Sequence, residues 1–316
     1  MVGRGDTVAD ALNATRVIAQ AAEARGYRRI WYAEHHNMSS ITSAATAVLI
    51  AHVAGNTRRI LLGSGGVMLP NHSPLAIAEQ FGTLASLHPG RIELGLGRAP
   101  GSDPATTHAL RRDQASAEAF PQDVLELQAF LAGESLVPGV QAIPGAGTHV
   151  PLTILGSSLF GAQLAAHLGL RYGFASHFAP EALVDAVALY RRMFTPSGQS
   201  EVPHVTAAMN VVVAESPEAA EDLLEQVRRR RVASFLGRGY GREFTEDEID
   251  QLIGTPQAAQ ILGMMRHTAV GTPPQVRTQL EEFQSFADAD ELIVVINAVT
   301  TEGRLRCLNL LADAYA

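Results

Sequence analysis

The sequence predicts an α/β protein built as a single (β/α)8 TIM barrel. Short apolar runs alternate with amphipathic helical stretches along the chain, which is typical of parallel strands joined by helical crossovers. The apolar runs are continuous, as expected for strands buried on both faces. Polar residues and glycines follow one strand after another, and a barrel gathers such residues at one end. We expect one domain over residues 1–316, since α/β barrels of this length are common.

In the first third of the chain, capping and helix-ending residues separate the elements. Asp6 or Thr7 is suited to begin a helix that Gly26 ends, and Ser73-Pro74 is suited to begin another that Pro89-Gly90 ends. "SITSAATAVLIAHVAG" is predicted as a helix closed by Gly55. The predicted strands here are 28–33, 59–65 and 91–97.

The remaining chain repeats the alternation, with predicted strands at 151–156, 172–176, 204–213 and 291–297. Helices are predicted between them and after the last. Residues 237–267 read as an insertion with short helices, because they are rich in glycine and lack a strand pattern. These seven strands are one fewer than a closed barrel needs. The chain opens with a helix, so we expect the barrel's first strand to be missing.

Composition restricts the classes of function. The net charge is −8 and the pI is near 5.8, which argues against a general nucleic-acid binder. The one basic run, Arg228–Arg231, is interpreted as the solvated C-terminus of a helix over 217–236. No apolar run is long enough for a membrane span, and no signal peptide is recognisable. The single cysteine, Cys307, permits no internal disulfide and is consistent with a cytoplasmic protein.

Polar and glycine residues follow most of the predicted strands, and they define the candidate site. In chain order they are Glu34-His35-His36-Asn37, Gly65-Gly66, Arg98, Gly156-Ser157-Ser158, Ser176-His177 and Asn297. The carboxyl ends of barrel strands are where active sites are built.

The Glu-His-His run admits three readings. A metal site is disfavoured, because neighbours on a strand point to opposite faces, so we expect no metal. A buried, hydrogen-bonded structural pair is a second reading. The third, which we favour, is one histidine facing a pocket to give or take a proton, since histidine titrates near neutral pH.

The glycine-rich segments also have competing interpretations. "GSGG" at 63–66 is either a bulge or a place where backbone approaches a flat ligand. "GSS" at 156–158 is either a simple helix cap or a phosphate cradle, for which Arg98 one strand away supplies a countercharge. "GLGRAPG" only partly matches a dinucleotide motif, and Pro100 would interrupt the helix that this motif requires.

Taken together, "RIWYAEHHN", "ILLGSGGVMLPNHSP", "RIELGLGRAPGSD", "VPLTILGSS" and "DADELIVVINAV" resemble the bacterial luciferase-like flavin-dependent monooxygenases. The similarity covers nearly the whole chain from residue 6 and is greatest to single-chain, luciferase-α-like oxidoreductases. The resemblance implies a (β/α)8 barrel with a late insertion. It also implies that the cofactor is reduced FMN, supplied by a separate flavin reductase, or F420 as in related enzymes. It also implies a homodimer.

The resemblance assigns roles to particular residues. His35 matches the catalytically important first histidine of the Glu-His-His run, and Gly65-Gly66 matches a non-proline cis peptide against the flavin ring. Arg98 matches a phosphate-binding arginine, and Gly156, Ser157 and Ser158 match the phosphate loop. His177 replaces an aromatic residue beside the ring.

The sequence also departs from luciferase α, because Gly97 replaces its reactive cysteine and Ser157 replaces its phosphate-loop glutamate. Neither light emission nor an aldehyde substrate is therefore implied. We expect a monooxygenase that acts on a small organic substrate with reduced FMN and O2. The alternatives are F420-dependent hydride transfer, in which Arg111-Arg112 would meet the longer anionic tail, and flavin binding without catalysis.

Overall fold

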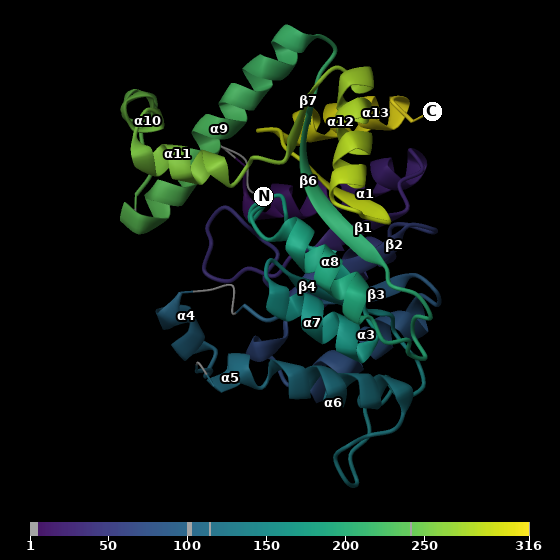
Figure 1. The fold of residues 1–316 in the computed structure, drawn as a ribbon. Helices are drawn as coiled ribbons and strands as arrows, with labels where there is room; N and C mark the ends of the chain where they lie inside the picture. The colour runs from purple at the N-terminus through teal and green to yellow at the C-terminus, as the bar shows by residue number, and fades with distance from the viewer. Residues whose placement is uncertain (1–5, 100–102, 114, 241, 316) are drawn as a thin grey trace.

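A parallel β-sheet with helices packed around it forms the centre of the molecule, as the computed structural model in Figure 1 shows. The structure describes residues 6–99, 103–113, 115–240 and 242–315. All described strand pairings are parallel. The strands are β1 (Arg29–Tyr32), β2 (Leu61–Met68), β3 (Ile92–Gly97), β4 (Leu152–Gly156), β5 (Arg171–Phe174), β6 (Val205–Val213), β7 (Thr268–Gly271) and β8 (Glu291–Ile296).

Helices connect successive strands, as parallel pairing requires. In the first half they are α1 (Val8–Ala24), α2 (Thr46–Ala54), the 3-10 helix η1 (Leu69–Asn71), α3 (Pro74–Leu87), α4 (Pro104–Ala109), α5 (Ala115–Glu118) and α6 (Phe120–Ala132). In the second half they are α7 (Leu159–Leu168), α8 (Leu183–Met193), α9 (Pro217–Tyr240), α10 (Glu246–Ile253), α11 (Pro256–Gly263), α12 (Pro273–Phe286) and α13 (Thr301–Asp313).

The strand order follows the chain from β1 to β6 and then divides. Asn210 and Val211 of β6 pair with both β7 and β8, so those two strands lie on opposite edges of β6. Ala207 pairs with both β5 and β8, which places β7 on the same edge as β5 and beyond its end. The barrel order is therefore β1 to β6 followed by β8, and β7 is a short additional strand.

The prediction of a parallel α/β barrel is confirmed, and all seven predicted strands are present. The prediction missed β7, which has only four residues and follows directly on the predicted insertion. Within the described ranges no strand pairing joins β1 to β8, so the sheet is open there. Across this opening Arg29 Nε donates to Glu291 Oε1 at 2.8 Å.

Two helix predictions were wrong in extent. α2 begins at Thr46 rather than near residue 40, because Ser40 to Ala45 form an irregular loop. α9 continues to Tyr240, so the basic run lies inside a helix rather than at its end. Arg229 forms ion pairs with Glu246 and Asp250 of α10, and Arg230 Nη1 donates to the carbonyl oxygen of Val299 at 2.6 Å. These contacts attach α9 to its neighbours.

The predicted insertion contains α10 and α11, which pack on α9 beside the sheet (Figure 1). Val232 of α9 and Ala258 and Ile261 of α11 form a small hydrophobic cluster separate from the main core. The main core lies between the sheet and the helices around it, and its largest fully buried side chains include Tyr172, Tyr190 and Phe81.

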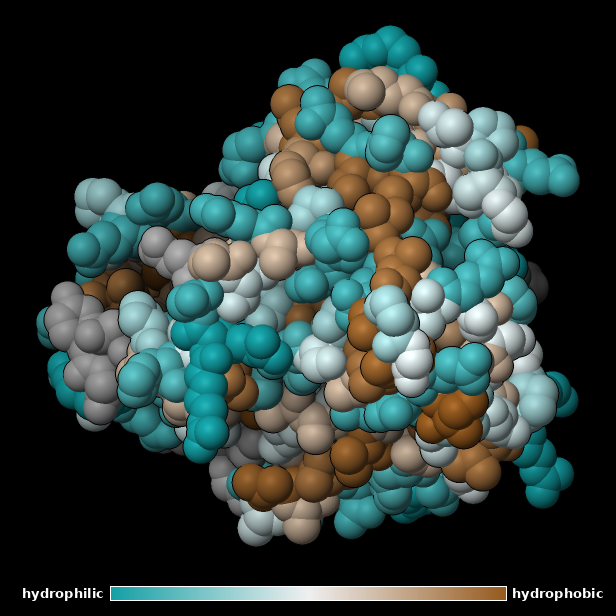
Figure 2. All heavy atoms as spheres, turned by 90° about the horizontal axis from the view of Figure 1, so that it is seen from below, coloured by the Kyte–Doolittle hydropathy of each residue, from teal (hydrophilic) through white to brown (hydrophobic). Residues whose placement is uncertain are grey.

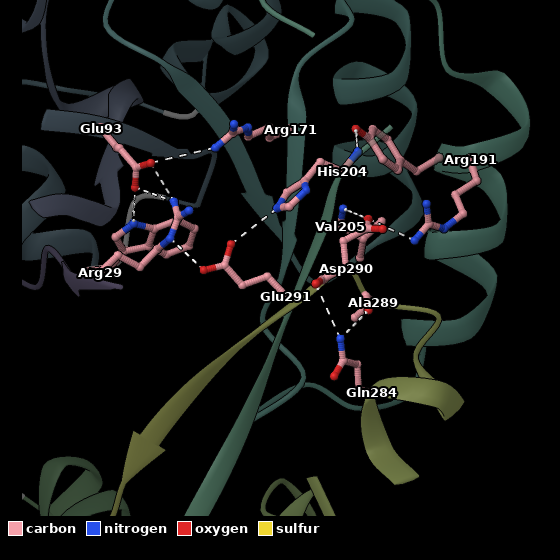
Figure 3. A network of polar contacts seen from close by, with 12 residues as sticks. Arg29, Glu93, Arg171, Arg191, His204, Val205, Gln284, Ala289, Asp290 and Glu291 are labelled. Carbon is pink, nitrogen blue, oxygen red and sulfur yellow. Dashed lines mark hydrogen bonds and ion pairs between the residues drawn. The ribbon is translucent and has the colours of Figure 1, made fainter. Parts of the chain in front are cut away.

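A buried ionic network occupies the amino-terminal end of the sheet, as Figure 3 shows. Arg29 Nη1 donates to both carboxylate oxygens of Glu93, at 2.6 and 2.5 Å. Arg171 approaches Glu93 at 3.8 Å, and His204 approaches Glu291 at 3.5 Å. Since these residues lie at or near strand starts, this end of the barrel is held together by charge pairs and the opposite end is left for the site.

Among the helices that the structure describes, none is both long enough and apolar enough to cross a membrane. On the face seen from below, hydrophilic side chains are interspersed with hydrophobic patches (Figure 2).

Candidate functional site

The predicted site residues share one end of the sheet. Glu34, His35 and His36 follow β1, Gly65 and Gly66 lie in β2, and Arg98 follows β3. Gly156 ends β4, Ser157 and Ser158 lie between β4 and α7, and His177 follows β5. Because every pairing among these strands is parallel, their carboxyl ends point the same way. The arrangement confirms that the strand-end residues lie on one side of the barrel, and their individual roles stay predictions.

The Glu-His-His run forms a carboxylate-centred cluster with a second segment of chain. The side chain of Glu34 is buried, and its Oε1 accepts from His36 Nε2 at 2.8 Å and from His72 Nε2 at 2.9 Å. Asn71 Nδ2 donates to Oε1 at 3.3 Å, and the Met68 backbone N–H donates to Oε2 at 3.0 Å. The backbone N–H of Glu34 donates to the Gly66 carbonyl at 3.2 Å.

These contacts keep the carboxylate ionised despite its burial. Burial alone would raise the pKa of Glu34, but hydrogen bonds from His72, His36 and the Met68 backbone lower it below its usual range. A buried carboxylate is costly unless its lone pairs are satisfied, and here several donors satisfy them. Glu34 therefore acts as a fixed acceptor at neutral pH.

The strand-alternation argument for the two histidines was wrong, because β1 ends at Tyr32 and residues 33–36 lie outside any strand. His36 turns to Glu34, whereas the His35 backbone N–H donates to the Ser43 carbonyl at 3.1 Å. In the described part of the chain, no group of three or more histidine, cysteine, aspartate or glutamate side chains is arranged to hold a metal ion.

The Gly65-Gly66 peptide bond is cis, as the sequence comparison with luciferase predicted. Packing accounts for both glycines. A Cβ at Gly65 would lie 2.9 Å from the Trp31 Cβ, and a Cβ at Gly66 would lie 2.7 Å from the Gly95 carbonyl oxygen. Real Cβ atoms do not approach so closely, so Trp31 and β3 require glycine here with or without a ligand. The peptide and the Trp31 side chain therefore form one packed unit.

Arg98 lies beside the amino-terminal end of α7. Its guanidinium stacks on the Phe160 ring, with Cζ 4.1 Å from the ring centroid, and Phe160 belongs to the first turn of α7. Both residues line a cavity of about 480 Å³ together with Ala117, Glu118 and Pro121. Ser158 occupies the N-cap position without a side-chain capping hydrogen bond. The first-turn N–H groups of α7 and a stacked arginine thus lie close together, an arrangement that suits an anion.

His177 is a neutral ring at physiological pH. Burial, together with the nearby charge of Arg231, lowers the pKa of His177 to about 4. Its ring meets the Phe178 ring edge-on at 4.8 Å, and its carbonyl oxygen accepts from Asn210 Nδ2 at 2.7 Å. The buried Nδ1 atom has no hydrogen-bond partner among the described residues. At the end of β5, the uncharged His177 ring therefore has one nitrogen, Nδ1, that is left to bond a ligand.

Sequence reasoning assigned no role to Asn71, His72 and Phe160, which lie at this end of the barrel, or to Trp31, which packs against Gly65 and whose indole N–H donates to Glu93 at 3.3 Å. Asn71 ends η1, the short helix that follows β2, and His72 comes next, and this position near a strand end was itself a signal that could have identified them. The packing of Trp31 against β2 and of Phe160 under Arg98 depends on tertiary contacts, which no local pattern encodes.

Comparison with protein families gives a match over most of the chain. The family model described as luciferase-like monooxygenase matches residues 2–289. A luciferase-like monooxygenase of Escherichia coli (strain K12) is 44% identical over 313 residues, which cover 99% of this chain and 93% of the relative. An N-acetyl-S-alkylcysteine monooxygenase of Bacillus subtilis (strain 168) is 30% identical over 321 residues, covering 99% and 95% of the two chains.

Solved structures have the same fold. Apo-MsnO8 superposes with a TM-score of 0.87 at 31% identity, covering 99% of this chain and 95% of its own. Two more distant structures show similarity of fold alone. The oxygenating constituent of 3,6-diketocamphane monooxygenase from Pseudomonas putida, in complex with FMN, gives a TM-score of 0.72 at 15% identity, covering 95% and 92%. The F420-dependent tetrahydromethanopterin reductase of Methanopyrus kandleri gives 0.68 at 17% identity, covering 94% of each chain.

Proposed function

We propose, from the premise that this chain belongs to the luciferase-like monooxygenase family, that it oxidises a small organic substrate with reduced FMN and O2. The observation that carries the proposal is the Arg98 guanidinium, stacked on Phe160 at the first turn of α7 and lining a cavity. A positive side chain beside a helix N-terminus is the arrangement that binds phosphate groups in proteins. A distant structural relative is solved in complex with FMN.

The FMN phosphate would bind to Arg98 and to the backbone N–H groups of Gly156, Ser157 and Ser158. The stacking on Phe160 limits the guanidinium to few orientations, which reduces the entropy lost on binding. The isoalloxazine ring would lie against the Gly65-Gly66 backbone, which Trp31 supports from one side. His177 would contact the ring through a neutral imidazole, whose partnerless Nδ1 is suited to a hydrogen bond with the ligand.

Reduced FMN, when bound, would supply the electrons that activate O2. The protein's own residues would hold the ring, keep water away and move one proton. His35 is the proposed proton-moving residue, because it directly follows Glu34 in the chain and because histidine is the side chain that most often transfers protons in enzymes.

A separate flavin reductase would supply reduced FMN, and the chain would act as one domain within a cytoplasmic homodimer. F420-dependent hydride transfer is the second candidate. The observations that favour it are the Arg111-Arg112 pair after α4, suited to a longer anionic tail, and the F420-dependent fold relative.

The test is an anaerobic mixture of the protein with reduced FMN, to which O2 is added while absorbance and O2 concentration are both recorded. We expect the protein to make O2 disappear before oxidised FMN appears, because a flavin that is bound and kept from water retains its reacted form longer than free flavin does. Free reduced FMN mixed with the Arg98→Met variant is the control. Simultaneous O2 loss and FMN oxidation with the native protein would refute oxygenase function, and binding of F420 in its place would support the second candidate.

A further inference from the structure

The buried carboxylate of Glu34 joins three segments of chain at the carboxyl ends of β1 and β2. It contacts His36 in its own loop, Met68 at the end of β2, and His72 just before α3. His72 Nε2 lies 2.9 and 3.0 Å from the two carboxylate oxygens, so it is shared between them. Through its backbone N–H, Glu34 also holds the Gly66 carbonyl. One residue thus connects the histidine-bearing loop with the proposed flavin-facing peptide.

An ionised carboxylate can only accept hydrogen bonds, which restricts both imidazoles. Each ring must present an N–H at Nε2 to Glu34, because an unprotonated Nε2 at 2.8 or 2.9 Å would set two lone pairs against each other. In the neutral form of either ring, Nδ1 then carries no proton. The only atom through which neutral His36 or His72 can take up a proton is therefore Nδ1.

We propose that Glu34 is a positioning residue of the site, which fixes His36 and His72 in the Nε2–H tautomer and presents their Nδ1 atoms as proton acceptors. The inference rests on the proposed oxygenase function for its role in turnover. The tautomers of the two rings are a property of the protein without flavin. His36 and His72, which come from two segments and share one carboxylate, would thus act in addition to His35.

The arrangement differs from an ordinary surface pair in two ways. Glu34 is 1% exposed, so water cannot replace a lost donor without entering the core. The titratable groups in contact with its carboxylate are His36 from its own loop and His72 from the segment before α3, and both are partly exposed. The rings are thus anchored at one nitrogen on a buried acceptor while part of each ring reaches solvent or ligand.

The first test is nitrogen NMR of the native protein labelled with ¹⁵N in its histidine rings, recorded without flavin above pH 7. The variants His36→Gln and His72→Gln assign the two signals. We expect both rings to show a protonated Nε2 and an unprotonated Nδ1. A protonated Nδ1 in the neutral form of either ring would overturn the proposal, and this reading needs no variant of Glu34.

The second test compares Glu34→Gln with Asn71→Ala. The glutamine amide has the same shape but both donates and accepts, so we expect at least one of the two rings to change tautomer. Asn71→Ala removes a neutral donor from the same carboxylate and should leave both tautomers unchanged. Unchanged signals of the other histidines would show that each variant keeps the fold. Unchanged tautomers in Glu34→Gln would contradict the positioning role.

The third test separates positioning from mere support of the fold. In Glu34→Gln we expect the dissociation constant of reduced FMN to change less than threefold, while the rate of bound-FMN oxidation by O2 falls about ten- to hundredfold and its pH profile changes. An unaltered pH profile would show that Glu34 only supports the structure and would overturn the proposal. If the native protein binds no FMN, the proposed function fails, whereas the NMR result still decides the tautomers.

Discussion

Replacing Glu93 by glutamine should destabilise the protein substantially, because it breaks a buried ion pair without changing the shape of the side chain. The Arg29 and Glu93 side chains are only 5% and 9% exposed, and their bidentate contact is drawn in Figure 3. Removing one partner of a buried pair costs about 3–5 kcal/mol. In the variant, Arg29 keeps its ion pair with Glu291 through the Nε atom. We therefore expect a loss of stability at the lower end of this range, about 3 kcal/mol.

The assay is chemical and thermal unfolding followed by circular dichroism and by the fluorescence of Trp31, the only tryptophan. A loss of about 3 kcal/mol corresponds to a melting temperature lower by about 4–5 °C in a chain of this size. Asp288→Asn is the matched control, since its pair with Arg191 is largely solvent-exposed and should contribute at most about 1 kcal/mol. Equal midpoints for the two variants would refute the idea that the network stabilises this end of the barrel.

Three further predictions concern the opposite end. Because the pKa of His177 is about 4 in the fold and about 6.5 when unfolded, the unfolded chain binds the proton first, and stability should fall as pH drops from 6.5 to 4. The loss is about 3 kcal/mol at most, and His177→Phe should reduce this pH dependence in urea titrations; an unchanged slope would contradict the burial of a neutral ring. Arg98→Met should weaken FMN binding about tenfold or more but leave riboflavin, which lacks the phosphate, nearly unaffected; equal losses for both ligands by calorimetry would place Arg98 elsewhere than at the phosphate. Gly66→Ala should cost about 1–3 kcal/mol because its Cβ would lie 2.7 Å from the Gly95 carbonyl, whereas Gly254→Ala, with open space around it, should be nearly neutral; comparable denaturation midpoints would disprove the close approach.

Local pattern was sufficient for the barrel and for the position of the site. Continuous apolar runs identified β1 to β6 and β8, since both faces of these strands are buried or partly buried by helices and by the barrel interior. The four-residue β7 was missed because its pairing to the far end of β6 depends on tertiary contact. The end of α9 was misplaced because its arginines pair with α10 and with the loop after β8, so the helix does not end in solvent.

Individual side-chain partners could not be predicted from sequence to the same extent. His72 reaches Glu34 from 38 residues away along the chain. The glycines of β2 were interpreted either as a bulge or as a place where backbone approaches a flat ligand, and the sequence did not show that Trp31 packs against Gly65. Both contacts arise where two strands come together, so they depend on the register between β1 and β2 rather than on either segment alone.

We propose that the carboxyl end of the barrel binds reduced FMN, and an anaerobic titration followed by Trp31 fluorescence is the decisive experiment. Trp31 lies against Gly65, so a ring placed on the Gly65-Gly66 peptide should quench its emission. We expect saturable quenching with one reduced FMN per chain and weaker quenching with riboflavin. No saturable change with reduced FMN, in a protein shown to be folded, would contradict the proposed site.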